Sequence, residues 1–224
     1  MFFFLSLSSL LHFQSLNIQA GQHIILRAYI KGKAINRQYT PINLICSKGY
    51  FELLIKIYPD GVMSQYLQTM KPGIEVEFRG PFGQFSMQQI VKFPRLFLLA
   101  AGTGIAPLSC VIESILDNED DETFVHLLFA CRYYGDILMK EELHDWLDFW
   151  NFSSLCCLSQ DHSESVGFCK EPLHFGRITL DLLKTEIKDL CNTYFLICGS
   201  NSFNKDMVNF LLELQVPESQ YFIF

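Results

Sequence analysis

The stretch from Arg95 to Leu108 is the feature that most constrains how this chain can fold. Residues 95–101 are almost entirely apolar and end in two alanines, and Gly102-Thr103-Gly104 follows directly. An apolar run of this length is typical of a buried strand. The glycines allow a sharp turn, and Pro107 suits the first turn of a helix. We therefore predict a strand, a tight turn and a helix in immediate succession.

A turn of this kind can receive a phosphate group. Glycine has no Cβ atom, so backbone N–H groups can face an anion, and the helix that follows adds unpaired amides and the positive end of its dipole. Each charge favourably placed there gains about 0.3–1 kcal/mol. Gly-Thr-Gly after a strand is also an ordinary tight turn, and the longer GxGxxG pattern is absent. On this stretch alone, both interpretations stay open.

The residues before position 94 have a β-like rhythm. Strand candidates lie at 22–30, 42–46, 50–58 and 74–79, with a short helix over 63–70. Gly and Pro turns separate these segments, which is the pattern of an antiparallel β-barrel.

After position 94, strands and helices alternate. We predict strands at 95–101, 124–131, 154–159, 194–198 and 221–224, and helices at 106–117, 138–150, 179–190 and 204–214. Such alternation is typical of a parallel sheet with helices on both faces and ligands at the carboxyl ends of the strands. We therefore expect two domains, an antiparallel β-barrel over 1–93 and an α/β parallel-sheet domain over 94–224, with the boundary within 88–94.

Charge is distributed unevenly between the two predicted domains. The 224 residues carry a net charge of −7, which argues against general nucleic-acid binding. Residues 1–94 hold nine Lys/Arg and four Asp/Glu, whereas residues 95–224 hold eight and twenty. The two halves therefore face different partners, or each other.

The cysteines and the first residues bear on the cellular compartment. Eight cysteines, at positions 46, 110, 131, 156, 157, 169, 191 and 198, form no CxxC pair and no zinc-site spacing. We expect reduced, buried thiols, no metal site and a cytoplasmic protein. Residues 1–13 are apolar but too short to span a bilayer. They could form a strand, the remnant of an alternative start, or a signal or anchor segment.

Six segments in order along the chain resemble the NADH-cytochrome b5 reductase family of ferredoxin reductase-type flavoproteins. Arg37-Gln38-Tyr39-Thr40 is similar to the first flavin motif of that family, and Gly61-Val62-Met63-Ser64 is similar to the second. The remaining four are the segments 78–83, 102–107, 198–199 and 221–224. The resemblance implies a flavin-binding barrel followed by a nicotinamide-binding α/β domain.

The resemblance also implies a flavin site in the first domain. Arg37 offers a planar fork of donors that suits phosphate oxygens, and Tyr39 offers a ring for the isoalloxazine. Thr40 is implied as a catalytic residue that bonds near flavin N5. The other implied cofactor-binding residues are Gln38, Leu54, Lys56, Tyr58, Gly61, Val62, Met63 and Ser64. Without the resemblance, Arg37 and Tyr39 would more often be a solvated surface pair, and Met63 a core residue.

A nicotinamide site is implied in the second domain. Gly102, Thr103 and Gly104 would receive the dinucleotide, Cys198 and Gly199 would lie beside the nicotinamide, and Phe224 would be the terminal aromatic residue near the flavin. Cys198 is the second implied catalytic residue, although a cysteine at the end of a strand is more often a packing residue. Arg132 and Asp136 follow the next strand, where they favour NADPH and NADH respectively.

The implied activity is an FAD-dependent oxidoreductase that passes a hydride from NADH to flavin and then single electrons to a haem protein such as cytochrome b5. We expect a monomer, located in the cytoplasm or at a membrane surface. The family's first barrel strands are replaced here by the apolar residues 1–13. The alternative is therefore a truncated, non-catalytic variant that retains only nicotinamide-nucleotide binding.

Overall fold

The computed structural model describes residues 2–8, 18–43, 49–162, 166 and 169–224. These residues divide into two compact units, Met1–Ser86 and Met87–Phe224. No helix of the described ranges is long and apolar enough to cross a membrane.

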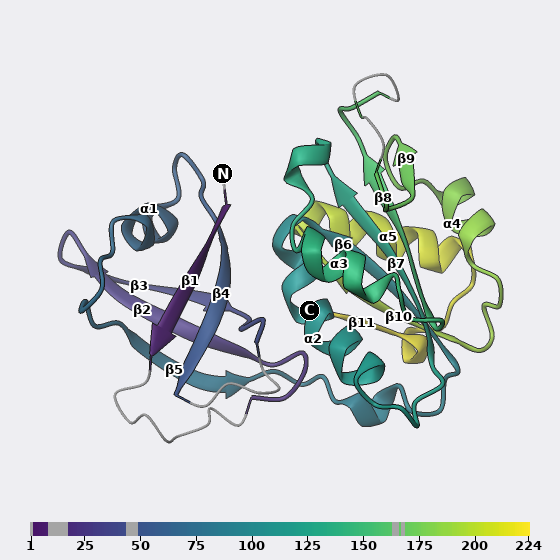
Figure 1. The fold of residues 1–224 in the computed structure, drawn as a ribbon, viewed down its shortest axis with the longest axis horizontal. Coiled ribbons are helices and arrows are strands. Elements are labelled where there is room, and N and C mark those ends of the chain that lie inside the picture. Colours follow the sequence, from purple (N-terminus) through teal and green to yellow (C-terminus); the bar gives the residue numbers. More distant parts are fainter. Residues whose placement is uncertain (1, 9–17, 44–48, 163–165, 167–168) are drawn as a thin grey trace. The chain divides into compact units, whose positions relative to one another are not determined.

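Unit 1 is built from antiparallel strands and one short helix (Figure 1). Its elements are β1 (Phe2–Ser8), β2 (His23–Ile30), β3 (Lys33–Tyr39), β4 (Tyr50–Lys56), α1 (Val62–Gln68) and β5 (Glu77–Phe82). The strands pair as β1-β4 and as β3-β2-β5. After β3, Pro41 forms an isolated bridge with Leu53 of β4, which links the two sheets. The predicted strand over 42–46 lies mostly outside the described residues.

The apolar start of the chain forms a strand of unit 1. β1 pairs antiparallel with β4 over its full length, from Phe2 opposite Lys56 to Ser8 opposite Tyr50. Phe3, Leu5 and Leu7 pack against the core of the unit, while Phe4 is 55% exposed. This alternation is that of a strand with one buried face. Residues 2–8 therefore supply a strand to the barrel, and residues 9–13 lie outside the described part.

The core of unit 1 lies between its sheets and α1. It consists of apolar residues from β2, β4 and α1: Ile24, Leu26, Ala28, Phe51, Leu53, Ile55, Met63 and Leu67. The odd-numbered residues of β4 face this core, because successive side chains of a strand point to opposite faces. Leu54 and Lys56 consequently lie on the other face of β4.

Unit 2 is a parallel sheet with helices on both faces (Figure 1). Its strands are β6 (Arg95–Ala101), β7 (Phe124–Cys131), β8 (Phe152–Leu158), β9 (Leu173–Phe175), β10 (Thr193–Cys198) and β11 (Tyr221–Ile223), in the order β11-β10-β6-β7-β8-β9. Its helices are α2 (Ile105–Leu116), α3 (Lys140–Trp146), α4 (Leu180–Glu186) and α5 (Asn201–Glu213). The two-domain fold prediction is confirmed.

The helices cover the sheet in two pairs. The face that contains Phe97, Leu128 and Phe195 forms one core with residues of α4 and α5. α2 and α3 lie on the opposite side of the sheet in Figure 1. α2 is almost wholly buried, including both Ser109 and Cys110. Helices cover both faces of the sheet. Because its six strands are parallel, all of their carboxyl ends lie along one side of the sheet, and a ligand would bind there.

The structure differs from the sequence prediction in several elements. β3 and β9 were not predicted as strands, and β5 begins three residues later than expected. α3 covers only 140–146 of the predicted 138–150. It begins two residues later than predicted because Met139 before it adopts a left-handed conformation with φ of 53°. The seven described cysteines are free thiols, and Cys46 lies outside the described residues.

Candidate functional site

Arg37 of β3 is an exposed cation with no carboxylate partner among the described residues. One of its terminal nitrogens donates to the carbonyl oxygen of Asn36 at 2.8 Å. The rest of the guanidinium fork is open to an anionic ligand, and two parallel donors match the oxygens of a phosphate group. Gln38, the next residue, is also exposed and pairs across the sheet with Ile25.

Tyr39 lies at the end of β3, within electrostatic range of Arg37 and Tyr58. Burial raises the pKa of Tyr39, while the charge of Arg37 lowers it and Tyr58 raises it. Tyr39 also packs against the core of unit 1. Thr40 directly follows the last residue of β3, is half-buried and precedes Pro41, which bridges to β4. The structure thus brings three of the predicted residues, Arg37, Tyr39 and Tyr58, into one neighbourhood.

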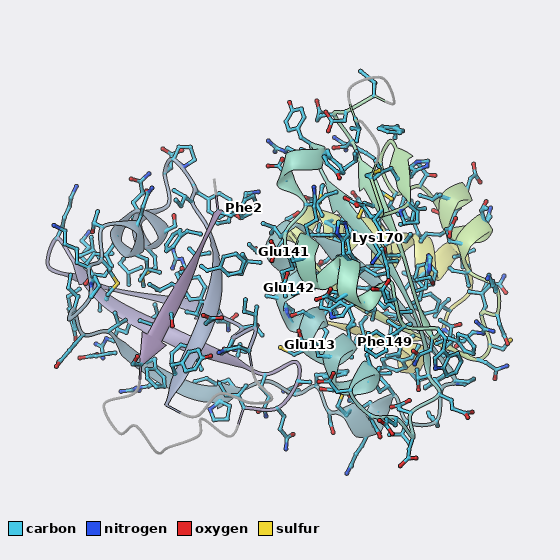
Figure 2. The ribbon with its side chains drawn as sticks, in the orientation of Figure 1. Phe2, Glu113, Glu141, Glu142, Phe149 and Lys170 are labelled. Carbon is cyan, nitrogen blue, oxygen red and sulfur yellow. The ribbon has the colours of Figure 1, made fainter. Side chains whose placement is uncertain are left out.

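Lys56 carries its ammonium group between two aromatic rings. Its Nζ atom lies 5.3 Å from the ring centre of Phe2 and 5.4 Å from that of Tyr58. Both distances are within the range of a cation–π interaction. Phe2 is labelled at the start of β1 in Figure 2. Lys56 and Tyr58 were both predicted as cofactor-binding residues, whereas Phe2 was not anticipated as a partner. The alternation of Leu5 and Leu7 with Ser6 and Ser8 is the signal that could have indicated a strand there.

The loop from Tyr58 to Gly61 is fastened to the first turn of α1. The Ser64 hydroxyl donates to the Gly61 carbonyl oxygen at 3.0 Å and accepts from the Tyr58 N–H at 3.2 Å. The Gln65 amide donates to the carbonyl oxygens of Tyr58 and Pro59. A bond from Ser64 to a phosphate oxygen would need the proton that Gly61 already accepts. Ser64 therefore shapes the loop here, and its phosphate contact stays a prediction.

Three further predicted residues of unit 1 differ in accessibility. Val62, at the start of α1, is 50% exposed, whereas Met63 is 2% and Leu54 4% exposed. Met63 belongs to the core, so a ligand would meet only its backbone. A Cβ atom on Gly61 would lie 2.5 Å from the Ser64 oxygen, so a side chain at this position would displace the Ser64 hydroxyl from the loop.

In unit 2, the predicted glycine turn lies at the carboxyl end of β6. Gly102 has φ of +54°, and a Cβ atom on it would have no neighbour within 4 Å. A Cβ on Gly104 would lie 2.1 Å from the carbonyl oxygen of Cys198. The turn therefore packs directly on the backbone at the end of β10, and α2 begins immediately after it. Thr103, between the two glycines, is half-buried.

The ends of β10 and β11 complete this arrangement. A Cβ on Gly199 would lie 2.5 Å from the Phe203 ring, so this position too requires glycine. Burial raises the pKa of the Cys198 thiol to about 12, which keeps it neutral at pH 7. The backbone N–H of Phe224 donates to the Ile197 carbonyl oxygen at 3.0 Å, and its ring meets Phe222 edge-on. The five predicted nicotinamide-side residues before Phe224 are thus gathered at one edge of the sheet.

The donor sets of the two units match the groups that the resemblance implies. Unit 1 offers a guanidinium, an ammonium and two phenol rings, which suit an anionic cofactor with a flat ring system. Unit 2 offers a glycine turn with open backbone in front of a twelve-residue helix, which suits a pyrophosphate. Within the described ranges, no three His, Cys, Asp or Glu side chains are grouped so that they could hold a metal ion.

A buried carboxylate cluster was missed by the sequence interpretation. Glu171 contacts His144 and Lys140 of α3, and its side chain has no exposed surface. These partners lie 27 or more residues before Glu171 in the sequence, so no local pattern announces the cluster.

Comparison with known proteins places each unit in an oxidoreductase family. Residues 2–87 match the family model described as the oxidoreductase FAD-binding domain, and residues 98–209 match the oxidoreductase NAD-binding domain. The chain is 40% identical over 213 residues to "NADH-cytochrome b5 reductase-like" of Mus musculus, which covers 93% of this chain and 67% of that protein. It is 35% identical over 213 residues to "NADH-cytochrome b5 reductase 1" of Dictyostelium discoideum, with 93% and 71% covered.

The fold also matches solved structures. The cytochrome b5 reductase domain of Ulva prolifera nitrate reductase superposes with a TM-score of 0.86 at 22% identity. The match covers 100% of this chain and 91% of that one. At this identity the match supports the fold, and the more similar relatives support the family.

Proposed function

Because the chain belongs to the family of FAD- and NAD-binding oxidoreductases that includes the NADH-cytochrome b5 reductases, we propose that it oxidises NADH and delivers single electrons to a haem protein. The oxidoreductase activity and the use of FAD and NADH follow from the family. The identity of the haem protein, with cytochrome b5 as the first candidate, is our proposal.

The observation that carries this function is the close packing of the Gly102–Gly104 turn on the end of β10. The absence of a side chain at Gly104 lets the turn lie against the Cys198 carbonyl group. A dinucleotide bound over the turn through its pyrophosphate would therefore have Cys198 and Gly199 beside it. Those two residues would then orient the nicotinamide ring, with Cys198 acting as a neutral thiol.

In unit 1, we propose that Arg37 pairs with the flavin phosphates and that Tyr39 lies against the isoalloxazine. Lys56, steadied by the rings of Phe2 and Tyr58, would present its ammonium group on the outer face of β4. When bound, FAD supplies the two-electron acceptor and one-electron donor chemistry that side chains lack. The residues of the chain bind and orient, and none of them needs to transfer a proton.

The truncated, non-catalytic alternative is not favoured. It assumed that residues 1–13 cannot replace the first strands of a barrel. The full-length pairing of β1 with β4 supplies a barrel strand from this segment. The FAD-binding family model also begins at residue 2.

We further propose that the protein acts as a monomer in the cytoplasm or at a membrane surface. Support for the cytoplasm comes from the cysteines, since the described ones are free thiols and three of those in strands, Cys131, Cys156 and Cys157, are buried. Gel filtration and fractionation of cells would test these two points independently of the enzyme assay.

The visible spectrum of the purified chain tests the central proposal. Bound oxidised flavin should absorb at about 450 nm, and addition of NADH under anaerobic conditions should bleach this band. The Arg37→Ala variant should bind FAD at least about tenfold more weakly, because charge-assisted hydrogen bonds contribute about 1.5–3 kcal/mol. Lys33→Ala, an exposed cation at the start of the same strand, is the matched control. A colourless wild-type chain that cannot be reconstituted with FAD would contradict the proposal.

A further inference from the structure

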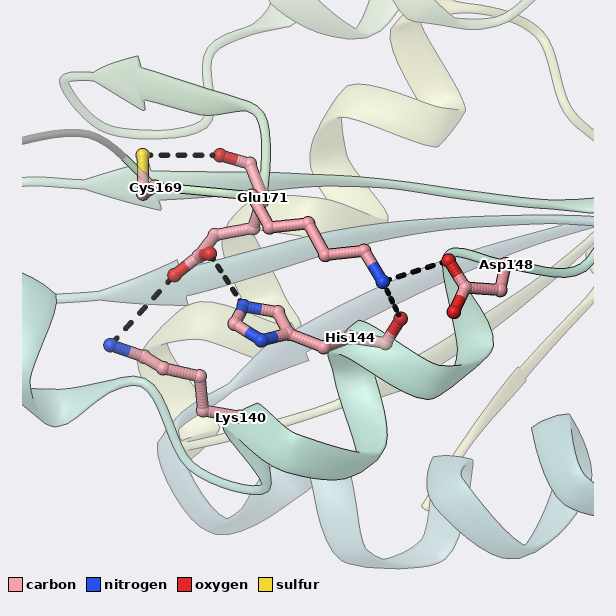
Figure 3. A network of polar contacts seen from close by, with 6 residues as sticks. Lys140, His144, Asp148, Cys169 and Glu171 are labelled. Atoms are coloured by element: carbon pink, nitrogen blue, oxygen red, sulfur yellow. Dashed lines mark hydrogen bonds and ion pairs between the residues drawn. The ribbon is translucent and has the colours of Figure 1, made fainter.

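Glu171 is a fully buried carboxylate that the proposed reaction does not use. Its Oε2 atom accepts a hydrogen bond from His144 Nε2 at 2.8 Å, and its Oε1 atom lies 3.8 Å from Lys140 Nζ (Figure 3). Its side chain has 0% exposure, whereas those of His144 and Lys140 are about one-third exposed. A buried carboxylate of this kind is costly unless it is well paired, so its partners need explanation.

The third partner of Glu171 is Tyr134. The Tyr134 hydroxyl interacts with the Glu171 carboxylate, and burial together with this interaction raises the pKa of Tyr134 to about 12. The Lys140 ammonium lies 3.5 Å from the centre of the Tyr134 ring. Tyr134 is therefore held twice, through its hydroxyl by Glu171 and through its ring by Lys140. Although burial alone raises the pKa of Glu171, the bonds from His144 and Tyr134 and the charge of Lys140 bring it below its ordinary value.

Tyr134 belongs to the segment that follows β7 at the carboxyl edge of the sheet. Its backbone N–H donates to the carboxylate of Asp161, and the Arg132 carbonyl oxygen accepts from the N–H of Gln160 at 2.9 Å. Both bonds tie segment 132–136 to the chain that leaves β8. The segment is thus held by Glu171 through Tyr134 and by the loop that follows β8.

The strand order indicates which half of a bound dinucleotide would lie over segment 132–136. β6 lies between β10 and β7, and the Gly102–Gly104 turn contacts β7. With the nicotinamide on the β10 side of the turn, beside Cys198, the other nucleotide must extend over the end of β7. Neighbouring strands are about 4.8 Å apart, so one nucleoside reaches the 132–136 segment from the turn.

We propose that Glu171 is a positioning residue, which acts through Tyr134 to hold segment 132–136 in place for the adenosine half of the nicotinamide nucleotide. This inference rests on the proposed function, because it assumes that NADH binds over the glycine turn. Glu171 itself touches no substrate. Lys170, the residue before Glu171, contacts the Asp148 carboxylate at 2.8 Å and the His144 carbonyl oxygen at 2.7 Å, which fastens it to α3 and to the turn that follows. The Cys169 thiol contacts the Glu171 carbonyl oxygen at 3.5 Å.

The test compares ligands that do and do not contain adenosine. Binding of ADP-ribose to the FAD-loaded full chain is measured by calorimetry, and steady-state rates are measured with NADH and with reduced nicotinamide mononucleotide. Glu171→Gln and Tyr134→Phe should each raise the Kd for ADP-ribose and the KM for NADH by about tenfold, with kcat at saturating NADH within about twofold of the wild type. Rates with reduced nicotinamide mononucleotide should not change, because this substrate lacks the adenosine half.

The matched control is Glu186→Gln. Glu186 also pairs with a histidine of unit 2, His126, at 3.2 Å, but His126 lies near the start of β7, far from its carboxyl end. This variant should leave the Kd for ADP-ribose unchanged. If Glu171→Gln fails to fold, Tyr134→Phe, which removes only a hydroxyl, still tests the inference.

Two results would overturn the inference. One is an ADP-ribose Kd within about twofold of the wild type in the folded variants. The other is an equal loss of activity with both reduced nucleotides, which would indicate a general structural defect. A wild-type chain that binds no ADP-ribose at all would instead contradict the proposed function, and the inference with it.

Discussion

At Gly104 a side chain would collide with the main chain of the neighbouring strand. The Cβ of an alanine would lie 2.1 Å from the Cys198 carbonyl oxygen, which is backbone and cannot move aside cheaply. We expect Gly104→Ala to lower the free energy of unfolding of unit 2 by more than about 2 kcal/mol. Gly102→Ala should cost about 1–2 kcal/mol, because that site is open but has φ of +54°.

Urea unfolding followed by tryptophan fluorescence measures both effects, since Trp146 and Trp150 are the only tryptophans of the chain and both belong to unit 2. Gly135→Ala is the control, because a Cβ there has no neighbour within 4 Å. If Gly104→Ala unfolds like the control, the close packing of the turn on β10 is wrong.

Glu113 of α2 makes the stability of unit 2 depend on pH. Burial, together with the charges of Asp117 and of Glu142 on α3, raises the pKa of Glu113 from 4.5 to about 7. Figure 2 labels Glu113 and Glu142. The folded state therefore binds a proton more tightly than the unfolded state does. Ionisation of Glu113 therefore lowers the free energy of unfolding. This penalty is absent below about pH 4.5, grows as the pH rises and is complete above about pH 7.

Glu113→Gln removes this penalty, so its Tm should exceed that of the wild type at about pH 8 and equal it at about pH 4.5. Thermal unfolding at the two pH values measures the difference. Glu213→Gln, on the exposed side of α5, should show no such change between them. An equal gain for Glu113→Gln at both values would exclude titration of Glu113 as the cause.

At the scale of elements, the leading strand β1 provides the sharpest test. Leu5 faces the core of unit 1 and pairs with Leu53, whereas Phe4 beside it is more than half exposed. We expect Leu5→Ala to destabilise unit 1 by about 1–3 kcal/mol, because it removes partly buried methyl groups. Phe4→Ala should change stability by less than about 0.5 kcal/mol. The temperature at which flavin fluorescence is released reports on unit 1, and equal effects of the two variants would contradict the pairing.

The elements that the sequence predicted well are those with a strong local pattern. The apolar runs of β6 and β7 were predicted with their observed bounds, because buried parallel strands have continuous apolar sequence. β9 has three residues and is held by its pairing with β8, which no local pattern encodes. β1 was left open between a strand and a leader, since its partner β4 lies more than forty residues away.

The same distinction applies to the candidate site. Residues at turns and strand ends, such as Gly102 and Arg37, could be predicted from sequence motifs. The partners of Lys56 and Glu171 come from distant segments, and tertiary packing alone brings them together. The role of Ser64 in the loop before α1 was likewise visible only once the hydrogen bonds were known.

At the scale of the whole chain, the unequal charge of its two halves should influence the haem partner. Residues 1–94 carry an excess of five positive charges, and residues 95–224 an excess of twelve negative ones. A basic flavin unit attracts an acidic haem protein over a range set by the Debye length, which falls from roughly 20 Å at about 20 mM salt to about 4 Å at about 500 mM. We therefore expect kcat/KM for cytochrome b5 reduction to fall about tenfold between these salt concentrations.

Two comparisons attribute this effect to unit 1. Lys31→Glu combined with Lys33→Glu reverses two exposed charges at the turn between β2 and β3 and should flatten the salt dependence, whereas Lys205→Glu on α5 should not. A neutral quinone as acceptor should show little salt dependence, because a neutral molecule is not steered by charge. A rate with cytochrome b5 that is constant across the salt series would mean that the charge of the flavin unit has no part in recruiting the acceptor. If the double variant kept the steep salt dependence of kcat/KM, other basic residues of the chain would be responsible for attracting cytochrome b5.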